Sequence, residues 1–274
     1  MRKKTSLSLK VVGTMVLLVF LCFLIIPHFL PHDPYETLLS LAFLPPGTKG
    51  YPLGTDNLGR CILCRILEGG RTTLFSSLCV VFVVFLAGTV LGTVSGFAGG
   101  KTDAVISRIV TIFQAFPGFV LAVAIAGILG QGLLNGILSL SLVYWTTYAR
   151  LSRSLVLTLK DAAFVRSARL CGANSAHIII KYILPELLPP MVITAAADIG
   201  MVTLSMAGLS FIGLGPARPT AEWGAMMSES RFCLQTAPWM IIFPGIALFC
   251  MVLLFNLFGD FLRDSLGKRN QPYE

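Results

Sequence analysis

The chain has 274 residues, of which 55% are hydrophobic and 12% charged, and its mean hydropathy is +0.81. This composition excludes an ordinary soluble domain, in which about a quarter of the residues are charged. The net charge of +8 would suit a nucleic-acid-binding protein, but the way the charges are distributed argues against one. We therefore expect an all-α polytopic integral membrane protein, whose surroundings are the lipid bilayer.

Apolar runs of about 20 residues, the length that crosses the hydrocarbon core of a bilayer, recur along the chain. They predict six transmembrane helices, near 11–30, 73–97, 106–130, 133–152, 187–209 and 238–260. Six crossings from a cytoplasmic N-terminus leave four segments inside, 1–10, 98–108, 150–186 and 260–274. These inner segments carry 15 of the 21 Lys and Arg residues, whereas the outer segments balance basic with acidic residues. This positive-inside asymmetry predicts that both termini are cytoplasmic.

The first apolar run follows Arg2, Lys3 and Lys4, as the core of a secretory signal peptide would. No small-residue cleavage site follows it, since Pro27 and His28 do not supply one. We therefore expect an uncleaved first span.

The outer segment after this span contains two features of interest. Residues 57–72 predict a helix lying along the outer membrane interface, with Arg60, Arg65 and Arg71 on its polar side. Cys61 and Cys64 form a lone CxxC without a second cysteine pair. A redox or zinc site is one interpretation of this spacing, and small buried side chains are the interpretation that we favour.

Four glycines follow one another at intervals of four residues in the second span: Gly88, Gly92, Gly96 and Gly100. A strip without side chains lets a neighbouring helix approach closely, so tight packing is expected here. A sliding or gating surface is the alternative.

Residues 95–102 (SGFAGGKT) resemble a phosphate-binding P-loop, but the leading glycine falls one residue late and a membrane helix precedes it instead of a strand. We therefore expect no ATP hydrolysis by this chain. No HExxH, GxSxG or Cys/His metal spacing occurs in the sequence. No catalytic residue and no metal ligand can be named, although a polytopic membrane enzyme and a purely structural scaffold stay as alternatives.

Residues 150–186 form a basic inner segment with six Lys or Arg against Asp161 and Glu186. Its pattern predicts two short helices. The first stops at Gly172, and the second restarts behind Asn174 or Ser175 and ends at Leu184 and Pro185. Two short helices exposed on one side of the membrane indicate a docking element for a soluble partner.

Asp198 lies in the middle of the fifth span, with Thr194, Met201 and Ser205 on roughly the same helical face. A carboxylate at this depth costs about 2.5–3.5 kcal/mol on insertion scales, so it should face protein or water. It is either a lining residue of a substrate path or a buried partner in a helix–helix hydrogen bond or ion pair. Tyr144, Trp145 and Tyr148 in the fourth span are a second candidate lining, and interfacial anchoring is their alternative role.

Several segments, in this order and at these spacings, resemble the inner-membrane permeases of bacterial ABC importers for dipeptides, oligopeptides and nickel. They are 52–60 (PLGTDNLGR), 96–103 (GFAGGKTD), 183–185 (ILP), 209–215 (LSFIGLG), 219–224 (PTAEWG) and 256–264 (NLFGDFLRD). The resemblance implies the type I ABC importer permease fold. It also implies three parts of the chain: 1–71, a transmembrane core at 72–262, and a cytoplasmic tail at 263–274.

The resemblance also implies the partners. These are a second homologous permease chain, two cytoplasmic ATPase subunits that bind ATP and Mg²⁺, and an extracytoplasmic solute-binding protein. This chain itself would need no cofactor. Residues 150–186 correspond to the loop that couples such permeases to their ATPase. The family's Glu-Ala-Ala is replaced here by Arg166, Ser167 and Ala168, six residues before Gly172, so the ATPase would present an acidic complement.

Residues 144–150 (YWTTYAR) and 197–200 (ADIG) are closer to the nickel-type branch of the family. The resemblance therefore implies import of nickel or a metal chelate across the bacterial cytoplasmic membrane. Peptides are the alternative cargo, and other solutes stay open.

Overall fold

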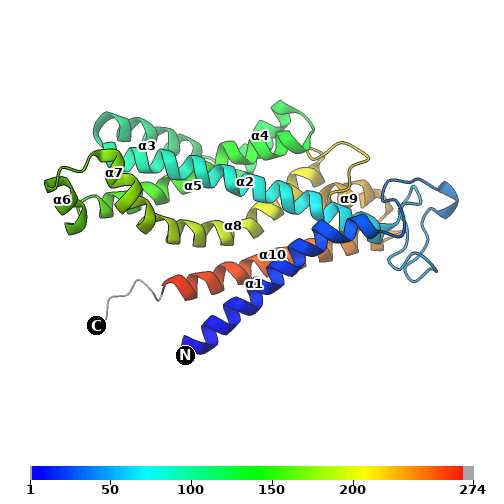
Figure 1. The fold of residues 1–274 in the computed structure, drawn as a ribbon. Helices are drawn as coiled ribbons and strands as arrows, with labels where there is room; N and C mark the ends of the chain where they lie inside the picture. The colour runs from blue at the N-terminus through cyan, green and yellow to red at the C-terminus, as the bar shows by residue number, and fades with distance from the viewer. Residues whose placement is uncertain (1, 268–274) are drawn as a thin grey trace.

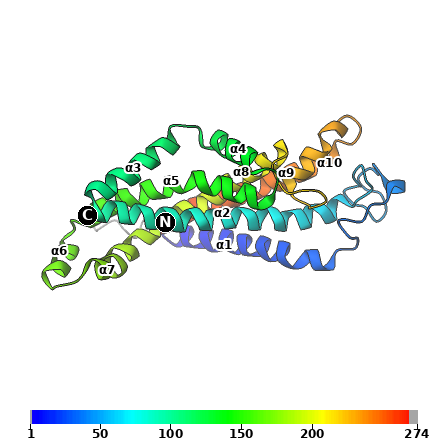
Figure 2. The ribbon, with the colours of Figure 1, turned by 90° about the horizontal axis from the view of Figure 1, so that it is seen from above.

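The computed structural model describes residues 2–267. Met1 and residues 268–274, the end of the expected cytoplasmic tail, lie outside the described residues. Within 2–267 the regular secondary structure is helical, with isolated β-bridges only at Thr48–Tyr51 and Thr55–Cys61. The all-α expectation is confirmed. The long helices run along one another through most of the length of the molecule (Figure 1, Figure 2).

In chain order the α-helices are α1 (Arg2–Ile25), α2 (Ile62–Ala98), α3 (Gly100–Gln114), α4 (Gly118–Leu129), α5 (Leu133–Leu159), α6 (Ala163–Leu170), α7 (Ser175–Ile178), α8 (Leu184–Ile212), α9 (Trp223–Ser230) and α10 (Trp239–Gly267). The shorter elements are the 3₁₀ turns η1 (Ile26–Phe29), η2 (Leu39–Leu41) and η4 (Arg231–Cys233), and a π-helical turn, η3 (Ile179–Ile183).

Three helices of the described chain are long and apolar enough to cross a membrane: α2, the continuous helix Ser175–Ile212, and α10. The α3–α4 pair makes a fourth if it is taken as one span. The other two expected spans fall on α1 and α5. The described apolar part of α1, Gly13–Ile25, is shorter, and α5 carries Arg150 and Arg153. A total of six spans therefore stays a prediction.

The third expected span, 106–130, is wrong as a single helix. The chain bends by 89° between α3 and α4. Pro117 caps the N-terminus of α4 in an extended conformation, and a residue that precedes a proline avoids helical dihedral angles. The break therefore falls at Ala115 and Phe116. This span is broken, with two short helices at a sharp angle.

The expected tight packing of the glycine strip is confirmed for three of its four members. A Cβ on Gly88 would overlap the side chain of Tyr148, and one on Gly92 would overlap the carbonyl oxygen of Ala149. A Cβ on Gly96 would lie 3.0 Å from the Arg153 carbonyl oxygen. The backbones of α2 and α5 therefore approach each other closely along this strip. Gly100 is not part of the strip, because it begins α3 and nothing lies beside it.

The polar segments gather at two opposite ends of the molecule (Figure 1). One end holds the start of α1, the α2–α3 junction, α6, α7 and the last turns of α10. The other end holds residues 30–61 and 213–238, which include α9 and which we call the loop cap. The described parts of the four segments expected on the inside of the membrane thus lie at one end, and the two segments expected outside lie at the other.

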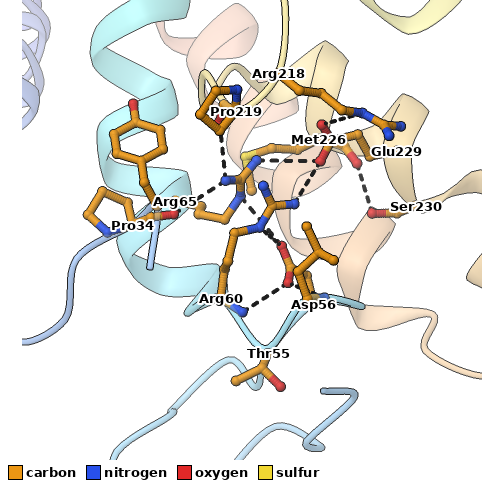
Figure 3. A network of polar contacts seen from close by, with 12 residues as sticks. Pro34, Thr55, Asp56, Arg60, Arg65, Arg218, Pro219, Met226, Glu229 and Ser230 are labelled. Carbon is orange, nitrogen blue, oxygen red and sulfur yellow. Dashed lines mark hydrogen bonds and ion pairs between the residues drawn. The ribbon is translucent and has the colours of Figure 1, made fainter. Parts of the chain in front are cut away.

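The interfacial helix expected over 57–72 is wrong. Helix α2 begins at Ile62 and continues to Ala98, so the expected start of the second span at residue 73 is eleven residues late. Arg60 and Arg65 are 3% and 1% exposed, not solvated. They lie in a network of buried charges under the loop cap (Figure 3). The sequence pattern suggested an amphipathic helix because it does not show that residues 213–238, with Glu229, cover these arginines.

This buried network joins distant segments of the chain. The Arg60 guanidinium bonds the Asp56 carboxylate at 2.6 Å and the Glu229 carboxylate at 2.9 Å. Arg65 lies 3.7 Å from the Asp56 carboxylate and 3.5 Å from that of Glu229. Arg218, which is exposed, bonds Glu229 at 3.1 Å. The network ties residues 54–65 to α9, which follows them by more than 150 residues, and so fixes the loop cap on the helices.

Candidate functional sites: the polar hairpin and the α5–α8 seam

The expected docking element is a helical hairpin, residues 160–183, which we call the polar hairpin. Helix α6 ends at Leu170, and Gly172 follows with a φ of +83°, a left-handed conformation that favours glycine. Asn174 caps α7 by accepting a hydrogen bond from the backbone N–H of His177 at 2.8 Å. The expected break at Gly172 and the restart behind Asn174 are confirmed.

The expected end of this second helix at Leu184 and Pro185 is wrong. The chain continues from Ser175 to Ile212 as one helix, with the π-helical turn η3 in between. Pro185 follows this π-helical turn, whose hydrogen bonding already departs from the regular ladder that a proline interrupts, and the chain stays helical through it. The polar hairpin is therefore joined to α8 without a loop.

The inner side of the polar hairpin is anchored in the core of the helix bundle. Val165 and Ile178 are 0% and 1% exposed and pack with residues of α5 and α8. Ala168 and Ile183 are buried in the same cluster. The Arg169 guanidinium lies over the Phe97 ring of α2, 5.6 Å from its centroid. These contacts couple the position of the hairpin to the long helices.

The outer side of the polar hairpin is exposed and carries both charge and apolar surface. Arg166 and Lys181 are exposed and form no ion pair with any residue that the structure describes. Leu170, at the end of α6, is 89% exposed. An open hollow of about 640 Å³ lies between the two helices. Its lining includes Ser167, Ala168, Gly172, Asn174 and His177.

A second polar contact joins α3 to α5 at the same end of the molecule. Asp103, in the first turn of α3, accepts hydrogen bonds from the Arg153 guanidinium of α5 at 2.5 and 2.6 Å. Ser95 at the end of α2 donates to the same carboxylate at 2.5 Å. The bond from Arg153 is the main reason that the pKa of Asp103 lies well below its usual value. Sequence reasoning missed this pair, because nothing in the sequence links residues 50 positions apart.

The candidate path residues meet in part, along a seam between α5 and α8. The Tyr144 hydroxyl of α5 lies 3.1 Å from the Ser205 hydroxyl of α8. One turn further along α5, the buried Tyr148 hydroxyl faces the half-buried carboxylate of Asp198 without an ideally placed hydrogen bond. The structure thus brings together one tyrosine with Ser205 and another with Asp198.

The other two candidates differ from this pattern. The Thr194 hydroxyl donates to the Pro190 carbonyl oxygen of its own helix at 3.0 Å, and so it is satisfied locally. Met201 is 63% exposed, whereas Ser205, on the same face by sequence spacing, is 8% exposed. Among the described residues, no group of three or more His, Cys, Asp and Glu side chains could hold a metal ion.

The long apolar helices surround a polar seam, and the polar hairpin, which also exposes apolar side chains, lies at one end of the molecule. These features define the class of a polytopic membrane permease. Comparison of the sequence with known families identifies the family. Residues 88–271 match the family described as binding-protein-dependent transport system inner membrane component, and the chain belongs to that family. It is therefore an ABC importer permease and a multi-pass inner-membrane protein. The resemblance noted in the sequence is confirmed.

The relatives are named for the transport of different cargos, although their sequence identities to this chain are similar. The nickel transport system permease protein NikC of Escherichia coli (strain K12) is 39% identical over 86% of this chain and 85% of its own. The dipeptide transport system permease protein DppC of Haemophilus influenzae is 36% identical over 93% and 88%. The glutathione transport system permease protein GsiD of Pectobacterium atrosepticum is 39% identical over 94% and 85%.

The fold resembles a solved structure of the inward-facing MetNI methionine ABC transporter, with a TM-score of 0.61 and 20% identity. The match covers 74% of this chain and 97% of the solved one. This similarity establishes the type I permease fold. In general, the fold implies ATPase subunits, a second permease chain and a binding protein as partners.

Proposed function

We propose that this chain forms one half of the translocation pore of an importer for nickel or a metal chelate in the bacterial cytoplasmic membrane. A second, homologous permease forms the other half. Two separate ATPase subunits bind ATP and Mg²⁺ in the cytoplasm, and an extracytoplasmic binding protein delivers the cargo. The chain is non-catalytic. The observation that carries this proposal is the polar hairpin, which exposes unpaired basic side chains and a large apolar side chain at one end of the molecule.

The orientation follows from the same feature. The polar hairpin, the α2–α3 junction, the start of α1 and the last turns of α10 share one end of the molecule, and we assign that end to the cytoplasm (Figure 2). The excess of Lys and Arg in these segments supports the assignment. Both termini are then cytoplasmic, and the loop cap faces outward. We retain the division into residues 1–71, a core at 72–262 and a tail at 263–274.

The polar hairpin is the part that docks on the ATPase. Arg166 and Ser167 are exposed on α6, and Leu170 projects from its end. The hollow beside Ala168 and Gly172 offers a socket for a side chain of the partner. Since a base stands where the family has an acid, the partner surface is acidic at this point.

Movement of the ATPases reaches the pore through the continuous helix Ser175–Ile212. One end of this helix belongs to the polar hairpin, and Asp198 lies near its middle. Leu184 and Pro185 stand where the hairpin passes into α8, next to the π-helical turn, a kind of irregularity that is frequent at functional sites. A tilt of the hairpin therefore displaces the side chains that face α5.

The candidate path runs along the α5–α8 seam, with Asp198 and Tyr148 at its centre and Tyr144 and Ser205 beside them. A carboxylate in a membrane span that faces a hydroxyl is suited to weak, reversible contact with a cationic cargo. Thr194 and Met201 complete the candidate lining. A chelated metal, selected outside by the binding protein, needs only such contacts.

Peptides are the second candidate cargo, because relatives named for dipeptide transport match a larger share of the chain than the nickel relative does. Uptake of labelled nickel and of a labelled dipeptide, each with the complete transporter and its binding protein, separates the two. Uptake of nickel alone supports the proposal, and uptake of the dipeptide alone contradicts the nickel assignment.

Docking is tested by deleting residues 160–175. Deletion is expected to abolish co-purification of the ATPase and leave membrane insertion intact. Because it also removes the buried Val165 and Ala168, we add Leu170→Asp, which changes one exposed side chain. Phe232→Asp, 84% exposed in the loop cap, is the matched control and should retain the ATPase. Normal ATPase recovery with both hairpin variants would contradict the docking assignment.

The path is tested with Asp198→Asn, which removes the charge and keeps the shape. If Asp198 lines the path, uptake should change while the amount of assembled complex stays close to normal. Tyr148→Phe, which removes only the facing hydroxyl, is the companion variant. Equal losses of assembly and uptake would instead assign to Asp198 the structural role of a helix–helix contact.

A further inference from the structure

A polar cleft lies between α3 and α5, and it shares no lining residue with the hollow of the polar hairpin. Its volume is about 180 Å³, far more than the roughly 10–15 Å³ that holds one water molecule. Helix α3 contributes Ser107 and Thr111 to its lining, α5 contributes Arg150 and Arg153, and α2 contributes Ser95. Two guanidinium groups in one cleft favour an anionic ligand.

The two arginines differ in what they already bind. The Asp103 carboxylate engages the Nε and Nη2 atoms of Arg153, which leaves Nη1 as a donor. Arg150 is exposed and forms no ion pair within residues 2–267. Because Asp103 compensates the charge of Arg153, the cleft keeps the positive charge of Arg150.

The hydroxyl groups of the cleft are already engaged. Ser95 and Ser107 donate to the Asp103 carboxylate at 2.5 and 3.2 Å, and Thr111 donates to the Ser107 carbonyl oxygen at 2.8 Å. The two serine bonds, with those from Arg153, compensate the carboxylate that would otherwise repel an anion. The donors that stay available are therefore guanidinium groups. Since a guanidinium matches the oxygens of phosphate with two parallel N–H bonds, a phosphate group fits this cleft.

The surface beside the cleft is apolar. Val105, Ile109 and Ile112 follow one another at helical spacing along α3, and all three are exposed. Ile106 and Val110 of the same helix line the cleft itself. A free phosphate ion gains nothing from such a surface, whereas the acyl chains of a lipid can pack against it. A basic cleft with an apolar face beside it therefore favours the headgroup of a phospholipid.

We propose that the cleft between α3 and α5 binds the phosphate group of an anionic phospholipid, with Arg150 as the main contact and Arg153 as the second. The lipid belongs to the cytoplasmic leaflet, which rests on the proposed orientation of the α2–α3 junction (Figure 1). Basic pockets between membrane helices on the cytoplasmic side are suited to such headgroups. Binding itself depends neither on this orientation nor on the cargo.

The bound lipid would strengthen a weakly packed part of the fold. Val110 is the one buried residue of α3, so little apolar packing fixes this helix. A phosphate that contacts Arg150 and Arg153 places the lipid at the junction where Asp103 already ties α3 to α5. The lipid therefore holds the first half of the broken span against α5.

The test measures lipid binding by the full-length chain, purified in mild detergent, with native mass spectrometry. The probes are phosphatidylglycerol, phosphatidylcholine, which has a phosphate but no net charge, and inorganic phosphate. One phosphatidylglycerol molecule is expected to stay bound under conditions that remove phosphatidylcholine. Equal retention of the two lipids would overturn the proposal. Displacement of phosphatidylglycerol by an equal concentration of inorganic phosphate would assign the cleft to free phosphate and overturn the lipid assignment.

Variants separate the cleft from the general positive charge of this end. Arg150→Gln should weaken phosphatidylglycerol binding about tenfold or more, because it removes a charged hydrogen-bond donor, and Arg150→Lys should recover part of the loss. Thr111→Phe keeps both arginines and fills the cleft from an exposed position, so it should also release the lipid. Arg263→Gln removes an exposed arginine of α10 that does not line the cleft, and it should bind like the wild type.

Two results with these variants would contradict the proposed site. Equal losses for Arg150→Gln and Arg263→Gln would mean that net charge alone holds the lipid. Full binding by Thr111→Phe would place the lipid outside the cleft. Because all these measurements are made in detergent, they do not depend on which end of the molecule is cytoplasmic. The lipid site and the proposed orientation can therefore fail separately.

Discussion

The loop cap and the polar hairpin both carry arginines, but they use them in opposite ways. At the loop cap, Arg60 and the neighbouring Arg65 of α2 are almost fully buried between the carboxylates of Asp56 and Glu229. In the polar hairpin, Arg166 is exposed and has no ion-pair partner among the described residues. The same side chain thus stabilises the fold at one end and stays available at the other.

The difference has a physical basis. A charge that is taken out of water is tolerated only when opposite charges and hydrogen bonds compensate it. Removal of one partner therefore leaves the other charge buried and uncompensated, which lowers the stability of the fold. An exposed charge interacts weakly with its surroundings, because water screens it. We therefore expect substitutions in the loop cap to change stability, and substitutions on the polar hairpin to change partner binding instead.

The largest loss of stability is expected for Arg65→Met. Methionine keeps most of the length of the arginine side chain but removes its positive charge. The buried carboxylates of Asp56 and Glu229 then lose part of the charge that compensates them. The substitution also removes bonds to the carbonyl oxygens of Pro34 and Pro219, at 3.3 and 3.4 Å. Breaking a buried pair costs about 3–5 kcal/mol in the free energy of unfolding. Unfolding of the purified protein in mixed micelles measures this loss.

The control for this prediction is Arg71→Met, the same change on α2 at a half-buried arginine without an ion pair in the described chain. It should cost at most about 0.5 kcal/mol, the range of ordinary surface changes. Equal losses for the two variants would show that the network contributes nothing beyond the packing of the side-chain stems.

How much of this contrast the sequence could predict depends on the distance between the partners. The turn of the polar hairpin was predictable, because Gly172 and Asn174 act on the backbone next to them. The network was not, because Arg60 and Glu229 are 169 residues apart and an exposed arginine has the same pattern as a covered one. The contact of Asp103 with Arg153 could not be predicted from the sequence for the same reason.

The bend between α3 and α4 is an intermediate case. Pro117 is a visible signal, but apolar residues continue on both sides of it, and the hydropathy pattern therefore favoured one span. Among the candidate path residues, helical spacing placed Asp198 and Ser205 on one face correctly. It placed exposed Met201 there as well, because spacing does not tell which neighbour covers a face.

A smaller effect, which depends on pH, is expected for Glu222→Gln in the loop cap. Glu222 is fully buried and caps α9, accepting from the N–H groups of Gly224 at 3.0 Å and Ala225 at 2.8 Å. Burial raises its pKa above the usual value, although these hydrogen bonds oppose the change. Loss of an N-cap acceptor costs about 0.5–2 kcal/mol.

The sign of the pH dependence follows from the raised pKa. The folded protein holds the proton of Glu222 more tightly than the unfolded chain, whose glutamates have a pKa of about 4.3. This contribution to stability is complete below that pH and is lost as the pH rises through the folded-state pKa. The deficit of the Gln variant should therefore be largest near pH 4 and shrink with rising pH. Glu36→Gln, exposed in the loop cap, is the matched control, and a deficit of Glu222→Gln that grows with pH would contradict the burial argument.

The smallest change in stability is expected for Arg166→Glu, within about 0.5 kcal/mol of the wild type, because the side chain is exposed. Its effect should appear in partner binding. Loss of a hydrogen bond to a charged group costs about 1.5–3 kcal/mol, so the ATPase should bind about tenfold more weakly or worse at low salt. Added salt should narrow the difference from the wild type, since screening weakens attraction and repulsion alike. Arg231→Glu makes the same charge reversal at an exposed site of the loop cap and should leave ATPase binding unchanged. Tighter ATPase binding by Arg166→Glu would mean that the partner surface is basic, and the acidic complement would then be wrong.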